Sequence, residues 1–274
     1  MFMTPRFAVM GNPIAHSLSP TIHQLFAKQT GLALTYDKIK IDVQRFESQV
    51  KEFFMLGGKG LNITLPCKER AFAMSQDRSI EATEAAAANT LWMHEGRLQA
   101  DNTDGIGFIR DVSRFLSLEG RSILLLGAGG AAHGVLGPLL RENPLMLVIV
   151  NRTLERAHEL QLKFPKTVAI SFDELPKVIA NTEPGFDVVI NATSAGLQGQ
   201  ALLLPNALMA RKPFCYDLAY NRHEATTFVT QVRAQGCEAT DGLGMLVEQA
   251  AEAFYIWFGI RPDAAKVLAT LKKM

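Results

Sequence analysis

A short apolar segment that runs directly into a glycine turn restricts the fold of this chain more than any other feature. Residues 122–126 read Ser-Ile-Leu-Leu-Leu, and the sequence Gly-Ala-Gly-Gly-Ala-Ala follows from residue 127 to residue 132. In this pattern a buried strand turns tightly into a helix, whose free N–H groups and positive dipole end face a pyrophosphate. The pattern predicts a parallel α/β layer of the Rossmann type that binds a dinucleotide. The turn residues expected to contact it are Gly127, Ala128, Gly129, Gly130 and Ala131.

The charge-free stretch around this turn has a second interpretation. Residues 122–140 contain no Asp, Glu, Lys or Arg, which approaches the length of a membrane span. Several glycines, His133 and Pro138 interrupt the stretch, and a buried strand, turn and helix explain these residues better. The first residues also lack the long apolar region of a secretory signal. We therefore expect no membrane partner.

The end of the next predicted strand distinguishes between two nicotinamide cofactors. The apolar residues 147–150 are followed by Asn151, Arg152 and Thr153. Sites for NAD usually place an Asp or Glu here, which accepts hydrogen bonds from the ribose hydroxyls. No acid occupies the position, whereas Arg152 and Arg156 supply positive charge for a 2′-phosphate, with Asn151 and Thr153 as further donors. The sequence therefore favours NADP over NAD.

Composition excludes several classes of protein. The 28 Lys+Arg and 27 Asp+Glu give a net charge of +1, which argues against a general nucleic-acid binder. Hydrophobic residues make up 48% of the chain, enough to bury a sizeable core. The three cysteines stand far apart without a Cys-x-x-Cys pair, which favours a reducing, cytoplasmic setting. The six histidines form no His-Glu-x-x-His cluster, so we expect no catalytic metal.

Strand and helix patterns alternate along the chain and change series near residue 104. An apolar stripe at the end of the chain predicts a C-terminal helix that stops at Gly259. The order of elements predicts an α/β fold with mostly parallel sheets. The predicted strands lie at 7–10, 35–41, 60–65, 122–126, 145–150, 186–190 and 214–218. The predicted helices lie at 20–30, 46–55, 105–116 and 245–258, with one more directly after the glycine turn.

Two serines precede the first predicted helix. Ser19 suits the N-cap position and Pro20 the first helical position. Two hydroxyls, those of Ser17 and Ser19, beside a helix N-terminus also suit a small carboxylate or phosphate. Helix capping is the alternative role for Ser19.

Further polar residues follow predicted strands in the first part of the chain. Asn62 and Thr64 share one face of the strand at 60–65, and Lys68 comes just past its end. A lysine with a nearby carboxylate is suited to proton transfer. Asn89 and Asp104 lie in short polar segments. A helix end, a polar turn and a solvated charge are the alternative interpretations of these residues.

A polar turn also follows the predicted strand at 186–190. Asn191, Thr193 and Ser194 lie in this turn, which ends at Gly196. The carboxyl ends of strands in a doubly wound sheet face the ligand, so these residues are candidates for contacts with the nicotinamide half. An Asn/Ser/Gly turn without a ligand explains the local sequence equally well.

Taken in order, these segments resemble the shikimate dehydrogenases over nearly the whole chain. Residues 11–20, Gly-Asn-Pro-Ile-Ala-His-Ser-Leu-Ser-Pro, resemble the opening signature of that family. Residues 58–68, Gly-Lys-Gly-Leu-Asn-Ile-Thr-Leu-Pro-Cys-Lys, resemble its lysine motif. Each segment is short, but the combination is highly specific. The other matching segments are 89–90, 101–105, 127–131, 151–153, 191–194, 216–218 and 241–249.

The resemblance implies an enzyme that interconverts shikimate and 3-dehydroshikimate with NADP, on the route to aromatic amino acids. It implies that Lys68 transfers the proton and that Asp104 is its partner. It further implies a substrate carboxylate bound by Ser17, Ser19 and Tyr220, and substrate hydroxyls bound by Thr64, Asn89, Asp104 and Gln249. Leu218 and Gly242 are expected to flank the nicotinamide, with Thr193 nearby.

The resemblance also implies two domains with the active site in the cleft between them. We expect a substrate domain at 1–104 and an NADP-binding Rossmann domain at 105–242. The helices of 243–274 should pack back on the substrate domain, because Gln249 has to reach the substrate. Relatives occur as monomers and dimers, so a monomer and a homodimer both remain open.

Three alternatives stay open at this stage. A quinate/shikimate dehydrogenase that uses NAD is the first, although the strand end without an acid argues against it. A nucleotide-sensing protein without catalysis is the second, and a methyltransferase with a similar glycine turn is the third. Cys67 departs from the family pattern beside Lys68, and we expect an apolar packing role for it.

Overall fold

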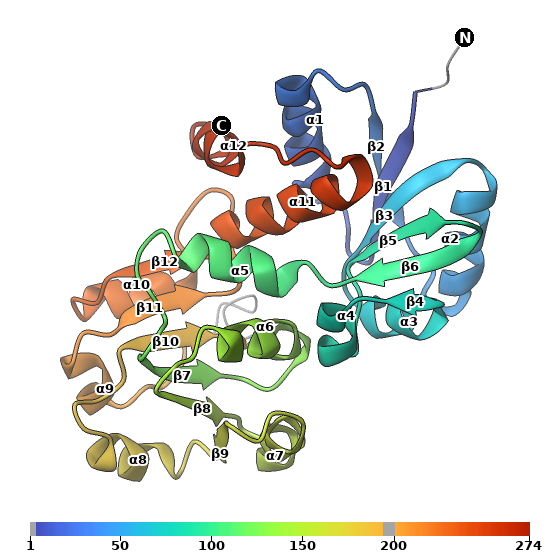
Figure 1. The fold of residues 1–274 in the computed structure, drawn as a ribbon. Coiled ribbons are helices and arrows are strands. Elements are labelled where there is room, and N and C mark those ends of the chain that lie inside the picture. Colours follow the sequence, from blue (N-terminus) through green and yellow to red (C-terminus); the bar gives the residue numbers. More distant parts are fainter. Residues whose placement is uncertain (1–3, 194–200) are drawn as a thin grey trace. The chain divides into compact units, whose positions relative to one another are not determined.

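The structure, a computed structural model, describes residues 4–193 and 201–274 (Figure 1). The chain forms two compact units. The first unit comprises Met1–Gly107 and Leu246–Met274, and the second comprises Phe108–Met245. The two points at which the chain passes from one unit to the other both lie inside helices, α5 (Asp104–Val112) and α11 (Leu243–Phe258). The boundaries expected from the sequence, after residues 104 and 242, fall inside or next to these same helices.

The first unit contains a mixed sheet with the strand order β2-β1-β3-β5-β6-β4. The β1 strand is parallel to β2 and β3, whereas β5 is antiparallel to both β3 and β6. Its strands are β1 (Arg6–Gly11), β2 (Thr35–Lys40), β3 (Gly58–Ile63), β4 (Asp77–Arg78), β5 (Thr90–His94) and β6 (Arg97–Asp101). Its helices are α1 (Ser19–Thr30), the 3-10 helix η1 (Val43–Arg45), α2 (Phe46–Met55), α3 (Lys68–Met74), α4 (Ile80–Ala85) and α12 (Ala264–Leu271), with most of α11.

Both faces of this sheet are covered. Ala8 and Met10 of β1 pack in one cluster with Phe46 of α2 and Ala71 of α3. The alternate residues of β1 point to the opposite face, where Phe7 contacts the ring of Trp257 from α11. Period-two alternation along a strand therefore places two separate apolar clusters on the two faces.

The second unit contains an all-parallel sheet with the order β12-β11-β10-β7-β8-β9. This is the doubly wound order in which the chain reverses direction across the sheet between β7 and β10. Its strands are β7 (Ser122–Leu126), β8 (Met146–Val150), β9 (Val168–Ile170), β10 (Val188–Asn191), β11 (Phe214–Asp217) and β12 (Ala239–Asp241). Its helices are α6 (Gly130–Arg141), α7 (Leu154–Lys163), α8 (Leu175–Asn181), α9 (Asn206–Ala210) and α10 (Thr227–Ala234), with most of α5.

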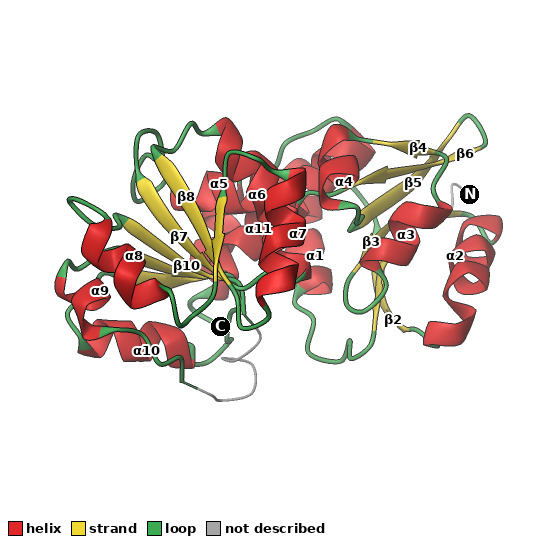
Figure 2. Ribbon diagram, turned by 90° about the horizontal axis from the view of Figure 1, so that it is seen from below, coloured by secondary structure: helices red, strands yellow, loops and turns green. Residues whose placement is uncertain are grey.

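The β7 strand shows why this sheet takes helices on both sides. Ile123 and Leu125 pack in one cluster with residues of α5, α6 and α7. Leu124 and Leu126 pack in a second cluster with residues of α8, α9 and α10. Figure 2 shows α6 and α7 on one side of the strands and α8, α9 and α10 on the other. A strand buried on both faces is apolar throughout, as residues 122–126 predict.

Several element predictions are confirmed, and the exceptions have local causes. The strand at 122–126 and the helix at 46–55 have the predicted bounds, and the C-terminal helix ends at Phe258, before Gly259 with a φ of 68°. The helix predicted over 105–116 ends at Val112, after which Leu116 N–H still bonds to the Val112 carbonyl in a turn. The strand predicted over 60–65 ends at Ile63, and Leu65 is exposed.

The predicted N-cap at Ser19 is wrong. Leu18 is the N-cap residue of α1, and no side chain caps it. Leu18 already has right-handed helical dihedral angles, so Ser19 lies inside the first turn. Ser17 accepts a hydrogen bond from the Ser19 N–H at 3.3 Å.

The antiparallel hairpin of β5 and β6 was not predicted. Glu95 and Gly96 connect the two strands, and both have positive φ angles, as in a type I′ turn. Its signal was the Glu95-Gly96 pair between two short runs, 90–94 with three apolar residues and 97–101 with alternating Leu98 and Ala100. Within residues 4–193 and 201–274, no helix combines the length and the apolar character that a bilayer span requires.

Candidate active site

The first unit brings the predicted catalytic pair into direct contact. The Lys68 ammonium lies 2.5 Å from the Asp104 carboxylate, Nζ to Oδ2. Lys68 begins α3 and Asp104 begins α5. The two side chains are 27% and 16% exposed, so the pair is partly shielded but open to a ligand.

Sheet topology explains why residues so far apart in sequence meet. Both β3 and β6 are antiparallel to β5, so they run in the same direction and end at the same edge of the sheet. Because β1 is parallel to β3, it ends there as well. Each predicted substrate residue in the first 104 positions follows one of these strand ends or precedes β5. These residues are Ser17 and Ser19 after β1, Thr64 and Lys68 after β3, Asn89 before β5 and Asp104 after β6.

A buried amide holds the second carboxylate oxygen of this pair. Asn89 Nδ2 donates to Asp104 Oδ1 at 2.8 Å and to Thr103 Oγ1 at 3.0 Å. It also lies 3.3 Å from Gln249 Oε1, so α11 contributes to the same group. Gly107 makes this approach possible, because a Cβ there would lie 2.7 Å from the Gln249 backbone nitrogen. The structure therefore unites Lys68, Asp104, Asn89 and Gln249.

The two serines lie together at the start of α1. Their hydroxyl oxygens are 3.2 Å apart, with Ser19 buried and Ser17 partly buried. The N-terminal N–H groups of α1 face the same end, which favours a bound anion such as a carboxylate. Thr64 is partly buried, and its methyl group packs against Gly11 at the end of β1.

In the second unit, the glycine turn lies at the reversal point of the sheet. Gly127 has a φ of +104°, and a Cβ there would lie 3.1 Å from the Ala192 backbone after β10. Its N–H donates to the Val150 carbonyl at 2.7 Å, so the turn is joined to the end of β8. Gly129 and Gly130 are exposed and have space around their Cα atoms, as a turn that receives a pyrophosphate requires.

The strand end after β8 presents positive charge. Arg152, Thr153 and Arg156 are exposed there. Asn151 makes two hydrogen bonds within the protein, because its Oδ1 accepts from Ala128 N–H at 3.2 Å and its Nδ2 donates to the Thr153 carbonyl at 2.8 Å. The Asn151 amide therefore holds the glycine turn to the strand end.

The neighbouring strand ends form a second polar group. Asn191 Nδ2 donates to Asp217 Oδ1 at 3.0 Å, and Thr193 Oγ1 donates to Asn191 Oδ1 at 2.7 Å. Burial raises the pKa of Asp217, which also accepts from Thr226 Oγ1 at 2.6 Å. Gly242 lies against Leu218, since a Cβ at 242 would be 2.4 Å from the Leu218 carbonyl oxygen.

Tyr220 belongs to the second unit and is partly buried, and burial raises its pKa. Of the predicted nicotinamide turn, Thr193 is described, whereas Ser194 and Gly196 lie outside the described residues.

The cysteine beside Lys68 has a packing role, as predicted. Cys67 is fully buried in the apolar cluster that contains Phe46 and Ala71. Burial raises the pKa of its thiol, which disfavours the reactive thiolate. Among the described residues, no three His, Cys, Asp or Glu side chains gather into a group that could hold a metal.

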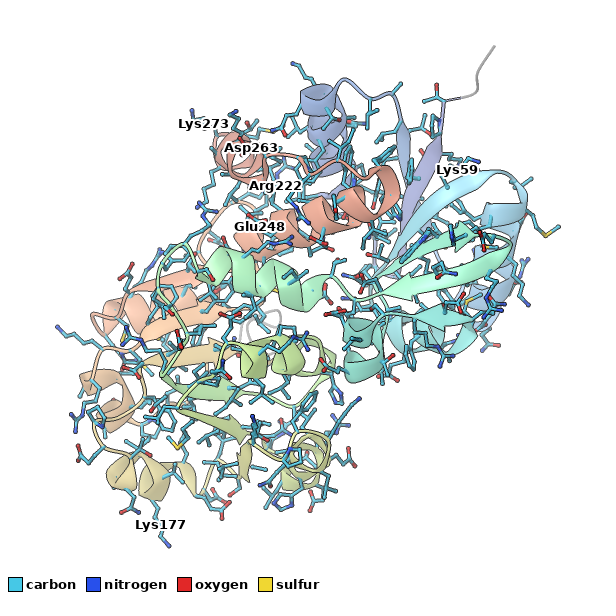
Figure 3. All side chains as sticks on the ribbon, viewed as in Figure 1. Lys59, Lys177, Arg222, Glu248, Asp263 and Lys273 are labelled. Atoms are coloured by element: carbon cyan, nitrogen blue, oxygen red, sulfur yellow. The ribbon has the colours of Figure 1, made fainter. Side chains whose placement is uncertain are left out.

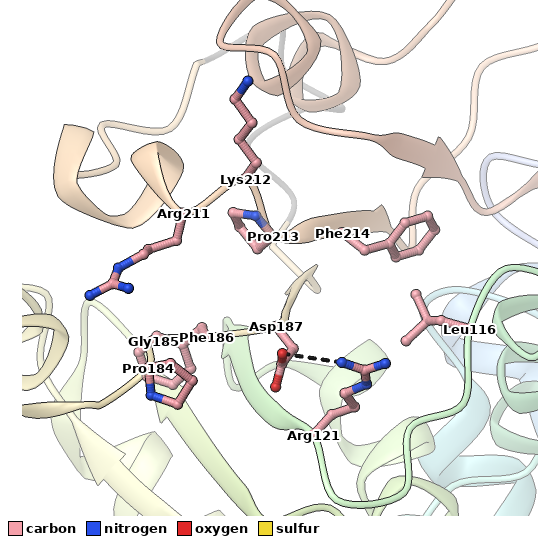
Figure 4. A pocket seen from close by; sticks show the side chains of 10 residues that line it. All are labelled: Leu116, Arg121, Pro184, Gly185, Phe186, Asp187, Arg211, Lys212, Pro213 and Phe214. Atoms are coloured by element: carbon pink, nitrogen blue, oxygen red, sulfur yellow. Dashed lines mark hydrogen bonds and ion pairs between the residues drawn. The ribbon is translucent and has the colours of Figure 1, made fainter.

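A hollow of about 420 Å³ lies at the opposite end of the second sheet (Figure 4). It is lined by residues that precede β7, β10 and β11, including Arg121, Asp187 and Lys212. The glycine turn follows the carboxyl end of β7, so this hollow is separate from the expected cofactor position. Arg121 contacts Asp187 there at 3.3 Å.

Sequence reasoning missed buried residues of the first unit that lie behind the site residues. Tyr36 and His23 were not singled out, and Thr90 was noted only within the matching segment 89–90, although all three are buried. Their signal was a polar residue at a position that points into the core. By contrast, exposed cations such as Lys59, Lys177 and Lys273 extend into solvent from both units (Figure 3).

The doubly wound sheet with its glycine turn defines a dinucleotide-binding α/β protein, whose additional unit carries a lysine–carboxylate pair. Three family descriptions match consecutive parts of the chain. They are the shikimate dehydrogenase substrate binding domain at residues 9–91, shikimate/quinate 5-dehydrogenase at 111–222 and the shikimate 5′-dehydrogenase C-terminal domain at 242–272.

Individual relatives cover almost the whole chain. A shikimate dehydrogenase (NADP(+)) of Legionella pneumophila is 56% identical over 270 residues, which span 98% of this chain and 99% of the relative. The crystal structure of an Ael1 enzyme from Pseudomonas putida has a TM-score of 0.91 and 42% identity, and covers 98% of both chains. Shikimate 5-dehydrogenase from Thermus thermophilus, solved with NADP(H) and shikimate, has a TM-score of 0.87 and 33% identity over 98% of this chain and 99% of that one. The chain belongs to the shikimate dehydrogenase family.

Proposed function

We propose that this protein is an NADP-dependent shikimate dehydrogenase, which reversibly reduces 3-dehydroshikimate to shikimate in the route to aromatic amino acids. The contact that carries the proposal is the one between Lys68 and Asp104, 2.5 Å long, at the edge where the substrate residues gather. Family membership supports the same reaction.

The residues of the second unit fit NADP. Gly129 and Gly130 are exposed, with open space around their Cα atoms, so a pyrophosphate could approach the backbone of the turn where α6 begins. No carboxylate stands at residues 151–153, where it would repel a 2′-phosphate. Arg152 and Arg156 would hold that phosphate, and Thr193, Leu218 and Gly242 would lie along the nicotinamide half. Bound NADPH supplies the hydride.

The residues of the first unit bind the substrate and move the proton. Ser17 and Ser19 hold the carboxylate at the N-terminus of α1, and Thr64, Asn89 and Gln249 hold hydroxyls. The Lys68 ammonium donates a proton to the substrate oxygen as the carbonyl is reduced, and it accepts that proton in the reverse direction. Asp104 orients the ammonium, because its two oxygens are held by Lys68 and by Asn89.

The test is an activity assay of the purified protein with shikimate and quinate against NADP and NAD. We expect NADP reduction with shikimate and little turnover with quinate or NAD. Efficient turnover of quinate with NAD would support the dual-specificity alternative. Absence of turnover with every pair would support a binding protein without catalysis.

Cofactor preference is predicted to depend on Arg152. Arg152→Ala should raise the KM for NADP about 10- to 100-fold and leave the kinetics with NAD unchanged, because a charge-assisted contact to the 2′-phosphate is lost. Steady-state kinetics with both cofactors measures the effect. Lys163→Ala is the matched control, since Lys163 is an exposed cation at the other end of α7. Equal effects of the two substitutions would contradict the role of Arg152.

We further assign the enzyme to the cytoplasm, as a monomer or homodimer that acts on a small molecule without a nucleic-acid partner. The three cysteines support a reducing setting, because all are free and buried. The net charge of +1 gives no basis for binding a polyanion. Sedimentation of the 30.1 kDa chain distinguishes the two assembly states.

A further inference from the structure

A series of buried hydrogen bonds within the first unit connects Tyr36 of β2 with the Lys68–Asp104 pair. We propose that Tyr36 is a positioning residue for this pair and acts through Asn62, Thr90 and Asn89. The inference rests on the proposed function, because it assigns Tyr36 a part in the turnover of shikimate. Tyr36 lies on β2, and its hydroxyl also makes a hydrogen bond with Ser19, which is expected to bind the substrate carboxylate.

The orientation of Asn62 follows from a backbone group. Asn62 Nδ2 lies 3.1 Å from the Asn89 carbonyl oxygen, which can only accept a hydrogen bond. The amide oxygen of Asn62 must then face the opposite way, toward the Tyr36 hydroxyl at 2.6 Å. The Tyr36 hydroxyl is therefore the donor, and it is what holds the Asn62 amide from that side.

The orientation of Asn89 follows in the same way. Thr103 N–H, which can only donate, lies 2.9 Å from Asn89 Oδ1. Thr90 Oγ1 accepts from Asn62 Nδ2 at 3.1 Å and donates its own proton to the same Asn89 oxygen at 2.9 Å. The nitrogen of Asn89 must then face Asp104 Oδ1 at 2.8 Å.

Each hydrogen bond in this series therefore has only one possible direction. Every donor faces the next group on the way from the Tyr36 hydroxyl to the Asp104 carboxylate. All the groups between Tyr36 and Asp104 are buried, so water does not replace a lost member at low cost. The Tyr36 ring is itself held by His23, whose ring stacks on it with centroids 4.2 Å apart and an interplanar angle of 11°. Burial also keeps the pKa of the Tyr36 phenol well above 10, so it remains a donor at physiological pH.

Removal of the Tyr36 hydroxyl is expected to loosen Asn62 first, then Asn89 and the catalytic carboxylate. Tyr36→Phe should lower kcat with shikimate about tenfold, since small displacements of catalytic groups reduce rates strongly. The KM for NADP should stay unchanged, because the cofactor residues belong to the second unit. Ser75→Ala is the matched control, as it removes a buried hydrogen bond of the same unit, from Ser75 Oγ to the Ala71 carbonyl, outside this chain of contacts. It should leave kcat unchanged.

A double-mutant cycle distinguishes positioning from general damage. Thr90→Val interrupts the same chain one step nearer to Asn89, and alone it should lower kcat about as much as Tyr36→Phe. The double variant should be no slower than the slower single variant. The inference would be overturned if the double variant lost as much kcat as the product of the two single losses. Full activity of Tyr36→Phe in the folded protein would overturn it as well. If Tyr36→Phe does not fold, the kcat of Thr90→Val tests the inference instead. A kcat equal to that of the wild type would then overturn it.

The proposed function and this inference fail in different ways. A wild-type protein that does not turn over shikimate would remove the proposed function itself. An active wild type with unimpaired Tyr36→Phe and Thr90→Val variants would remove the role of Tyr36 alone.

Discussion

Replacement of Lys68 by alanine is expected to lower kcat with shikimate about 10²- to 10⁴-fold, the range that proton transfer by a positioned side chain contributes. The Lys68 ammonium lies 2.5 Å from the Asp104 carboxylate, and the alanine side chain has no group that could donate a proton there. Shikimate should still bind with a similar Kd, because the two serines, Asn89 and Gln249 are unaffected. Stopped-flow turnover and calorimetric titration measure the two quantities separately.

The control for this experiment is Lys59→Ala. Lys59 is an exposed cation on β3 of the same unit, and its loss changes the net charge equally. It should leave turnover and binding unchanged. Near-normal turnover in Lys68→Ala would show that another group transfers the proton, and loss of shikimate binding with retained turnover per bound substrate would assign Lys68 to binding instead.

Stability in acid is expected to depend on His23. Its imidazole is 0% exposed among the rings of Tyr36, Phe26 and Trp257. Neither ring nitrogen has a hydrogen-bond partner among the residues that the structure describes. This burial lowers the pKa of His23 from 6.5 to about 3.

The sign of the effect follows from proton binding. Between pH 6.5 and pH 3 the unfolded chain protonates this histidine and the folded chain does not, so the free energy of unfolding falls as the pH falls. The full contribution of the uncharged His23 to the free energy of unfolding is present above pH 6.5. Below pH 6.5 the free energy of unfolding falls by about 1.4 kcal/mol for each pH unit. Over the interval from pH 6.5 to pH 3 the loss is about 5 kcal/mol.

The measurement compares wild type with His23→Phe, which keeps an aromatic ring against Tyr36 but cannot be protonated. Urea unfolding at pH 7, 6, 5 and 4, followed by tryptophan fluorescence, reports on the first unit because Trp92 and Trp257 both belong to it. The variant should lose about 1.4 kcal/mol less per pH unit than wild type below pH 6.5. The carboxylates that also titrate are common to both proteins and cancel in the difference.

His94 provides the control, since its side chain is 69% exposed in the same unit. His94→Gln should have the wild-type dependence on pH. Parallel pH dependences of wild type and His23→Phe would mean that the buried imidazole is protonated in the folded state as readily as in the unfolded one.

Particular residues show how far the sequence could predict the site. Lys68 and Asp104 were identified from the family resemblance, and their local sequence alone was compatible with a solvated charge and a polar turn. The hairpin of β5 and β6 was missed, yet it is what makes β3 and β6 run in the same direction and end at one edge. The contact of Asn151 with the glycine turn was not predicted, because it joins residues of two different strand ends.

Tyr36 and His23 could not be assigned from sequence. Tyr36 lies in an alternating strand, where an inward tyrosine is read as packing. Its hydroxyl acquires a role only because Asn62 of β3 lies within 2.6 Å and Thr90 of β5 lies beyond it. Such contacts depend on strand order and register, which no local pattern contains.

The sequence by itself determined the apolar β7 strand with its glycine turn, the positive strand end after β8, the C-terminal helix and the family. These features depend on residues close together in the chain, where periodicity, φ preference and charge act locally. The tertiary structure alone decided which polar groups meet. The direction of every hydrogen bond from Tyr36 to Asp104 is set by fixed backbone donors and acceptors that different strands bring together. Because these groups are buried, the loss of one hydrogen bond costs more free energy than it would at the surface.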